Sequence, residues 1–276
     1  MDRKIIRKRI KLMAQGLLAG SWLRSFLIVL LQTLLYAAII SFLPIRIPTL
    51  SEIANFSGTQ YEMLMMFVPK VITERTIALC VITLILYVLV MAPFSVGICR
   101  FFLRVASGAK GKISDVFSVY TNLRTVFSSV WLSIIIFLLS ALWMIVFMLI
   151  PITVAFCGSI IRSPLLVSFA SLLVPISAVF GLVWISRYEF ARFILAEGRA
   201  KGAFAAISEC FSLLKNRTGE CLALRTSYIL WDVASFYIYP LGFVYFSLFN
   251  TVYAQYLYYF RQGEMNMGEN SKNTEL

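Results

Sequence analysis

Long apolar runs alternate with short basic segments along almost the whole chain. Six runs are long enough for a membrane-spanning helix, which needs about 20 mostly apolar residues. They cover residues 24–43, 76–98, 126–150, 164–186, 219–238 and 240–260. The fifth run is the least apolar because it contains Arg225 and Asp232. The fifth and sixth runs are almost contiguous, so Tyr239-Pro240 marks either a tight reversal or a break in one long helix.

Lys and Arg are unevenly divided between the segments that connect these runs. If the six runs cross a bilayer in turn, 20 of these residues lie on one side and four on the other. Cytoplasmic segments of membrane proteins carry the excess of Lys and Arg. The bias therefore predicts a multi-pass protein of the cell (cytoplasmic) membrane with both termini in the cytoplasm. No small-residue cleavage site follows the first run, so we interpret it as a retained helix.

Three polar segments on the predicted cytoplasmic side have apolar residues at helical spacing. These residues are Ile6, Ile10, Met13 and Leu17 in the first, Ile113, Val116, Phe117 and Tyr120 in the second, and Phe204, Ile207, Phe211 and Leu214 in the third. Each segment directly precedes an apolar run and is too polar to span. We expect helices that lie on the inner leaflet with their apolar faces in the headgroup region.

The second and third segments also resemble each other in sequence. Residues 113–122 read ISDVFSVYTN, and residues 207–216 read ISECFSLLKN. The similarity predicts repeated helix–TM–TM units at 1–108, 109–198 and 199–263, followed by a flexible polar tail at 264–276. Ordinary loop helices that pack on the bundle without common ancestry are the alternative. The predicted fold is an all-α membrane protein: a single transmembrane domain over 1–263, with six transmembrane helices and two or three amphipathic helices.

The composition agrees with a membrane protein. Of the 276 residues, 60% are hydrophobic and 14% are charged, and the mean hydropathy is +0.85. Soluble domains are usually about 45–50% apolar. The net charge of +12 would suggest nucleic acid as the partner of a soluble protein. Here the basic residues lie between apolar runs, so we expect contact with anionic lipid and no nucleic-acid binding.

The residue inventory excludes several chemistries. The chain has no His, and none of its five Cys residues form a CxxC pair. Ser-His-Asp triads and His-based metal sites are therefore excluded. The sequence also has no Walker A, GxGxxG or HExxH motif. We therefore expect no enzyme activity, no cofactor and no metal. A membrane-embedded hydrolase that uses paired carboxylates would need two acids within the bundle, and Asp232 is the single candidate.

Asp232 and Arg225 form the first candidate site. A charge near the middle of a membrane helix costs about 2.5–3.5 kcal/mol on insertion scales, so such residues often have a function. In one continuous helix, the two residues would share a face, about 10.5 Å apart along the axis. They could bind an ion or polar ligand. The alternative is structural: Asp232 bonds to another helix, and Arg225 extends to the interface.

Four arginines at the ends of apolar runs form the second candidate set. Arg100 and Arg104 follow the second run, and Arg187 and Arg192 follow the fourth. They could hold anionic lipid headgroups. The alternative is that they only fix the topology.

Several motifs are similar to those of DUF975, a family of uncharacterised bacterial integral membrane proteins. They are Lys8-Arg9-Ile10-Lys11 with Gly20-Ser21-Trp22, the stretch 97–103, Ile113-Ser114-Asp115-Val116-Phe117, and above all the stretch 207–231. The chain departs from the family pattern at Asn216, where Gly is usual, and at Leu248-Phe249, where Pro-Tyr is usual. The resemblance implies a multi-pass bacterial membrane protein and carries over no catalytic residue.

The sequence thus favours a non-enzymatic accessory protein that binds lipid or a partner. Its expected partners are the lipid bilayer and, as an open option, another membrane protein. The alternative is a transporter or permease-like component for a small or amphipathic solute. A cavity containing Arg225 and Asp232 would favour transport.

Overall fold

The computed structural model describes residues 3–42, 74–215, 217–237 and 239–274. Side chains are described for these residues except at 3–4, 74–76, 232–233, 236–237, 239–240 and 263–274. The described residues form helices joined by turns, and no strand occurs among them. The all-α class predicted from the sequence is therefore confirmed.

Four helices are long and apolar enough to cross a membrane. They comprise α2 (Trp22–Ile40), the apolar part of α5 (Glu74–Ala106), α7 (Leu123–Ile160), and α8 (Pro164–Ile185) with its continuation through η1 (Ser186–Tyr188) and α9 (Glu189–Glu197). The protein buries only 28% of the most apolar stretch of α5 and 6% of that of α7. Such exposed apolar surface is unfavourable in water and favourable in lipid.

The chain divides into two compact units. One contains Met1–Val29 and Ala92–Leu276, and the other contains Leu30–Met91. In the smaller unit, the rings of Tyr36 and Tyr87 meet edge to face with centroids 5.6 Å apart. The borders of these units differ from those of the predicted repeats, and the single transmembrane domain stays a prediction.

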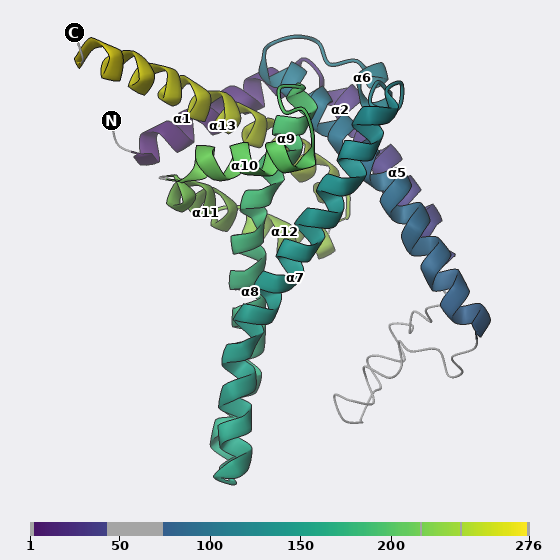
Figure 1. Cartoon of the computed structure of the whole chain (residues 1–276), viewed down its shortest axis with the longest axis vertical. Coiled ribbons are helices and arrows are strands. Elements are labelled where there is room, and N and C mark those ends of the chain that lie inside the picture. The colour runs from purple at the N-terminus through teal and green to yellow at the C-terminus, as the bar shows by residue number, and fades with distance from the viewer. Residues whose placement is uncertain (1–2, 43–73, 216, 238, 275–276) are drawn as a thin grey trace. The chain divides into compact units, whose positions relative to one another are not determined.

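Helices α7 and α8 form a long hairpin in the larger unit (Figure 1). Its turn is tight: Arg162 adopts a φ of +55°, and Pro164 occupies the first turn of α8. Small buried residues at positions 170, 177 and 181 of α8 recur at helical spacing. They allow close approach to α7, as is usual between membrane helices. A Cβ added at Gly181 would lie 2.7 Å from the Met144 sulfur.

Helix α13 (Tyr239–Thr274) is the central helix of the larger unit. Thr251, Val252, Tyr253 and Ala254 are all buried, and consecutive residues of a helix point about 100° apart, so protein surrounds this part of α13. Helices α1 (Arg3–Ala19), α9 and α12 (Ile229–Tyr237) pack against it. The ring of Phe190 in α9 stacks on Tyr253 with a centroid distance of 4.8 Å.

The C-terminal end of α5 is also joined to α13. The last carbonyl groups of a helix have no partner within it. Gln255 Nε2 donates to the carbonyl oxygen of Ala106, and Tyr258 Oη donates to that of Leu103 at 3.1 Å. Side chains of α13 therefore supply a partner for the Ala106 carbonyl and a second one for that of Leu103, which also accepts from the Ser107 N–H.

The predicted fifth membrane helix, 219–238, is divided in two. Helix α11 (Thr218–Thr226) ends at a turn over Ser227 and Tyr228, and α12 follows it. Each has nine residues, about 14 Å, which is less than half the thickness of a bilayer core. A continuous fifth helix was therefore a wrong prediction: Arg225 bonds sideways to α13, and the chain turns within the next three residues.

Other predicted boundaries also move. Pro151 lies inside α7 and does not end it, since membrane helices tolerate proline when neighbouring groups satisfy the freed carbonyl. Pro240 does lie in the first turn of α13, as its missing N–H permits. The backbone of the predicted tail is helical as far as Thr274.

The amphipathic segments pack on protein. In α1, Ile10, Ala14 and Leu18 are buried, whereas Met13 is exposed. Helix α6 (Ile113–Phe117) is much shorter than α10 (Ala203–Leu214), so the two similar sequences adopt helices of unequal length.

The predicted apolar stripes are only half correct. Val116, Ile207 and Leu214 are buried, but Phe117, Phe204 and Phe211 are exposed. Small residues such as Ala206 and Cys210 fill the protein side of α10, so its buried face is rotated from the predicted one.

Candidate functional site

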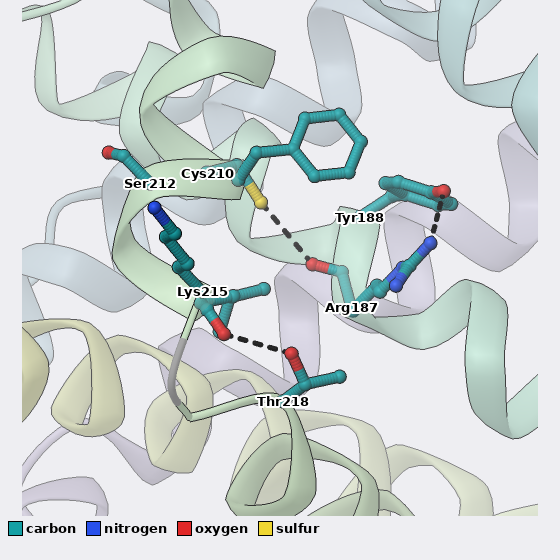
Figure 2. A pocket seen from close by; sticks show the side chains of 8 residues that line it. Arg187, Tyr188, Cys210, Ser212, Lys215 and Thr218 are labelled. Atoms are coloured by element: carbon teal, nitrogen blue, oxygen red, sulfur yellow. Dashed lines mark hydrogen bonds between the residues drawn. The ribbon is translucent and has the colours of Figure 1, made fainter.

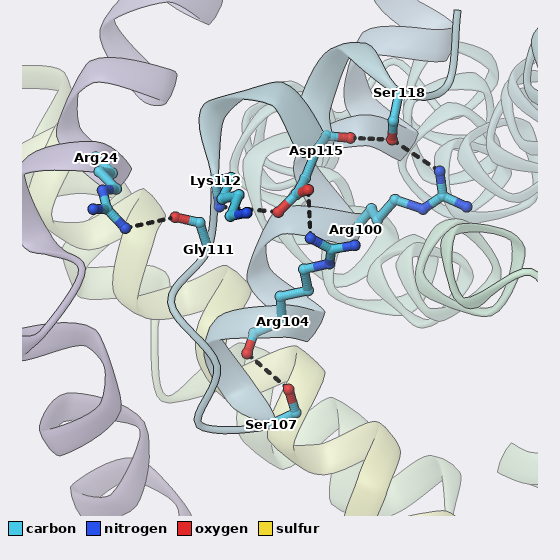
Figure 3. Close-up of polar contacts among 8 residues, drawn as sticks. All are labelled: Arg24, Arg100, Arg104, Ser107, Gly111, Lys112, Asp115 and Ser118. Carbon is cyan, nitrogen blue, oxygen red and sulfur yellow. Dashed lines mark hydrogen bonds and ion pairs between the residues drawn. The ribbon is translucent and has the colours of Figure 1, made fainter. Parts of the chain in front are cut away.

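Arg100 and Arg104 hold α6 against the end of α5 (Figure 3). Arg104 Nη1 lies 2.6 Å from Asp115 Oδ1, and Arg100 Nη1 donates to Ser118 Oγ at 2.9 Å. The backbone N–H of Lys112 donates to the second Asp115 oxygen at 2.9 Å. Arg104 therefore serves a contact within the protein, and the buried Asp115 carboxylate has both oxygens bonded.

The chain around α6 is fixed by two further contacts. Arg24 of α2 donates to the carbonyl oxygen of Gly111 at 3.1 Å (Figure 3). A Cβ at Gly97 would lie 2.1 Å from the carbonyl oxygen of Val116. Helix α6 therefore lies directly on the backbone of α5, where only glycine fits.

Arg192 pairs with Glu189 one turn before it in α9. Its Nη1 lies 2.9 Å from Glu189 Oε2, and both side chains are partly exposed. Such a pair neutralises Arg192 locally and contributes little stability.

Arg187 has a different environment, at the junction of α8 and α9. Its guanidinium lies 4.5 Å from the ring centroid of Trp184, 4.9 Å from that of Tyr188, 5.2 Å from that of Trp143 and 5.9 Å from that of Phe211. Aromatic faces attract cations, more strongly when water is excluded. The four rings therefore enclose a cation without neutralising it.

The hydroxyl of Tyr188 fixes this arrangement. It accepts a hydrogen bond from Arg187 Nη2 at 2.8 Å and one from Trp143 Nε1 at 2.7 Å. Trp143 belongs to α7, 45 residues away in sequence. The bond thus joins the α7–α8 hairpin to the guanidinium.

A cavity of about 380 Å³ opens beside Arg187 (Figure 2). Two cations line it, Arg187 and Lys215, together with the apolar side chains of Phe211 and Leu214. The remaining lining residues are Tyr188, Cys210, Ser212 and Thr218, so no acid among the described residues contributes to the wall. A cavity with cationic and apolar walls suits a ligand that is both anionic and apolar.

The neutral groups of the wall add no negative charge. Burial raises the pKa of the Cys210 thiol to about 12, so this thiol stays protonated near pH 7. It donates to the carbonyl oxygen of Arg187 at 3.5 Å (Figure 2). Thr218 Oγ1 donates to the carbonyl oxygen of Leu214 at 2.8 Å.

Two buried donors at the aromatic cluster have no acceptor among the described residues. They are Arg187 Nε and Trp184 Nε1. Buried donors normally find a partner, so each exception needs a physical explanation. Both atoms are buried, so they are not part of the cavity surface.

Arg225 has partners within the protein. Its Nη1 donates to Tyr245 Oη at 3.0 Å, and its guanidinium lies 5.0 Å from the ring centroid of Phe249. Asp232 lies in α12, but its side chain is outside the described residues. The turn after α11 removes the common helical face that the sequence predicted for the pair.

Sequence reasoning found Arg187 but missed the residues that make its site. Lys215 was counted only as one of many cytoplasmic charges, and Trp143 and Trp184 were assigned only to apolar runs. Tyr188 directly after the arginine was the one local signal, because an interfacial Tyr often bonds a neighbouring polar group.

Comparison with known proteins adds no relative. The chain matches no known family, no curated protein and no solved structure. The similarity to DUF975 therefore stays a prediction.

Proposed function

We propose that this protein is a non-enzymatic membrane protein that binds an anionic lipid on the cytoplasmic side, in the cavity between Arg187 and Lys215. The observation that carries the proposal is the guanidinium of Arg187, enclosed by aromatic rings beside a cavity whose described lining has a second cation and no acid. We also propose that the chain is a bacterial membrane protein of the DUF975 type.

The length of α8 supports a headgroup ligand. Its 22 residues extend about 33 Å, close to the thickness of a bilayer core. Arg162 and Arg187 flank it, so each falls at the level of a different leaflet's headgroups. The excess of Lys and Arg on the side of Arg187 favours the cytoplasmic leaflet. The cavity then lies where a lipid phosphate lies.

The proposed topology has both termini in the cytoplasm. Four long helices return the chain to the side on which it began. The six-crossing count requires that α11 and α12 together reach the outer face and that α13 returns. A re-entrant α12–α13 pair, which enters the membrane and leaves it on the same side, also returns the chain to its starting side. The placement of the termini therefore holds for either arrangement.

The transport alternative relied on Arg225 and Asp232 in a hydrated cavity. Arg225 bonds to Tyr245 and does not line the Arg187 cavity. No contact among the described residues favours transport over binding.

Native mass spectrometry of the detergent-purified protein tests the proposal. We expect more phosphatidylglycerol than phosphatidylcholine to be retained at equal lipid concentration. Lys215→Gln removes an exposed charge from the wall and leaves the aromatic cluster intact. It should weaken phosphatidylglycerol binding about fivefold, since a basic residue near anionic lipid contributes about 1 kcal/mol.

Lys110→Gln is the matched control, because Lys110 is exposed and does not line the Arg187 cavity. Equal retention by wild type, Lys215→Gln and Arg187→Gln, with all three folded, would refute a headgroup site at this cavity. Equal losses in Lys215→Gln and Lys110→Gln would mean that only general surface charge attracts lipid.

A further inference from the structure

A second cavity, of about 350 Å³, lies apart from the Arg187 cavity and shares no lining residue with it. Three separate segments form it. Arg100 comes from α5, and Arg124, Thr125 and Ser128 come from the first two turns of α7. The end of α9 and the connection to α10 supply Leu195, Gly198, Ala200 and Lys201.

The charges on this wall have one sign. Arg100, Arg124 and Lys201 line the cavity, and no acid does in the part of the chain that the structure describes. Neither Arg124 nor Lys201 has an ion-pair partner among the described residues. By contrast, Arg104, Arg192, Arg199 and Arg261 each pair with a carboxylate. Like charges that converge without a counter-charge repel one another, and an anion between them relieves the repulsion.

Neutral donors accompany the three cations. The hydroxyl groups of Thr125 and Ser128 line the cavity, and neither bonds to another described residue. Gly198 ends α9 with a φ of +83°, which turns the chain toward Lys201. The wall therefore combines a planar guanidinium fork, an ammonium group and hydroxyl donors, the set that proteins use for phosphate oxygens.

We propose that this cavity binds a phosphate group, carried either by a lipid headgroup or by a soluble phosphorylated molecule. The site is distinct from the Arg187 cavity in its residues and chemistry: its wall has three cations in place of two and has free hydroxyls. Its ligand would join α5, α7 and the α9–α10 connection. The positive-inside rule puts all three segments on the cytoplasmic side.

Thermal unfolding of the purified full chain in neutral detergent tests the soluble source. The probe is sodium pyrophosphate, compared with sodium chloride at equal ionic strength. We expect pyrophosphate at about ten times its Kd to raise the melting temperature by about 2–4 °C. Arg124→Gln and Lys201→Gln should each abolish most of this shift. Both positions are exposed, so the variants should fold.

Native mass spectrometry with phosphatidic acid tests the lipid source. If Arg124→Gln and Lys201→Gln lose phosphatidic acid at least threefold more than Lys110→Gln does, while pyrophosphate gives no shift, the ligand is a lipid phosphate. A pyrophosphate shift without selective lipid loss identifies a soluble ligand. If neither probe distinguishes these two variants from Lys110→Gln, the proposal is overturned.

Lys215→Gln separates this site from the proposed lipid cavity. In the Lys215→Gln background, the pyrophosphate shift and the extra phosphatidic-acid loss caused by Arg124→Gln or Lys201→Gln should stay the same, because Lys215 does not line the second cavity. If Lys215→Gln leaves phosphatidylglycerol retention unchanged while Arg124→Gln and Lys201→Gln lose the pyrophosphate shift or phosphatidic acid, only the first site is rejected. If Lys215→Gln weakens phosphatidylglycerol retention while the other two variants lose neither probe, only the second site is rejected.

Discussion

The hydroxyl of Tyr188 explains why Arg187 differs from the other arginines on its side of the protein. Arg104 and Arg192 each have a carboxylate within reach, and their charges are used in the fold. Arg187 donates to a neutral phenol and lies among rings, so its charge is not cancelled. A cation that keeps its charge in a largely apolar pocket attracts an anion strongly, because screening is weak there.

At the same scale, Gly97 is a sensitive test of the α5–α6 contact. Gly97→Ala would place a Cβ 2.1 Å from the carbonyl oxygen of Val116 and force the backbone of α6 to move. We expect the free energy of unfolding to fall by about 1–3 kcal/mol, as for other overpacked sites. Chemical unfolding in mixed detergent micelles measures it.

The matched control is Gly16→Ala in α1, where no atom lies within 4 Å of the new Cβ. Removing a helical glycine there should change stability little or raise it by about 0.5–1 kcal/mol. Equal effects of the two substitutions would contradict the close packing of α6 on α5.

At the scale of elements, α13 organises the larger unit although it is not among its most apolar helices. It closes the end of α5, stacks on α9 and receives α1 along its side. A helix surrounded by protein can contain Tyr, Asn and Gln, because neighbouring backbone and side chains satisfy their polar atoms. Its composition therefore reflects packing against protein more than contact with lipid.

Arg261 is the ionic link between α13 and its neighbours. Its Nη2 lies 2.6 Å from Glu197 Oε2 and 2.7 Å from Glu209 Oε1. Arg261→Gln should lower the free energy of unfolding by about 2 kcal/mol or more, since two carboxylates lose their shared, largely buried cation. Unfolding in mixed micelles again provides the measurement.

Arg199 offers the comparison for this link. It pairs with the same Glu197 at 3.4 Å, but 64% of its side chain is exposed. Arg199→Gln should cost less than about 1 kcal/mol. If the two substitutions cost the same, burial of the Arg261 cluster is not what makes it stabilising.

At the scale of the whole molecule, the tip of the α7–α8 hairpin and the connections near α6 and α10 lie at opposite ends of α7 and α8. Figure 1 shows the tip extending well beyond α11 and α12 within this unit. The tip has few charges and the other end has many, so a membrane around the hairpin has a defined direction.

Cysteine labelling tests that direction. In a variant without native cysteines, Ser163→Cys at the tip should react with a membrane-impermeant maleimide in intact cells. Lys110→Cys should react only after the membrane is permeabilised. The reverse pattern would invert the proposed orientation and move both cationic cavities to the outer face.

Maleimide labelling of a Gly242→Cys variant tests the number of membrane crossings. Labelling from outside would support six crossings, and protection from outside would support a re-entrant α12–α13 pair. Space exists for the substitution, because its nearest neighbour is the Ser235 Cβ at 3.5 Å.

The amino-acid sequence by itself determined the properties that depend on local composition. Runs of about 20 apolar residues predict membrane helices because the backbone must satisfy its own hydrogen bonds in lipid. Four such helices are present, and α1, α6 and α10 begin close to where the amphipathic periodicity places them. The basic bias likewise follows from counting residues in short segments.

Only the tertiary structure decided which charges remain available and which faces are buried. Trp143 bonds to Tyr188 and Lys215 lines the cavity beside Arg187 because α7, α8 and α10 pack together, and no local pattern encodes that arrangement. The stripe in α10 was predicted from its largest residues, yet close packing selected the small ones for the buried side. The division of 219–238 into α11 and α12 is likewise not encoded in the apolar periodicity, and Arg225 beside the turn bonds to Tyr245 of α13.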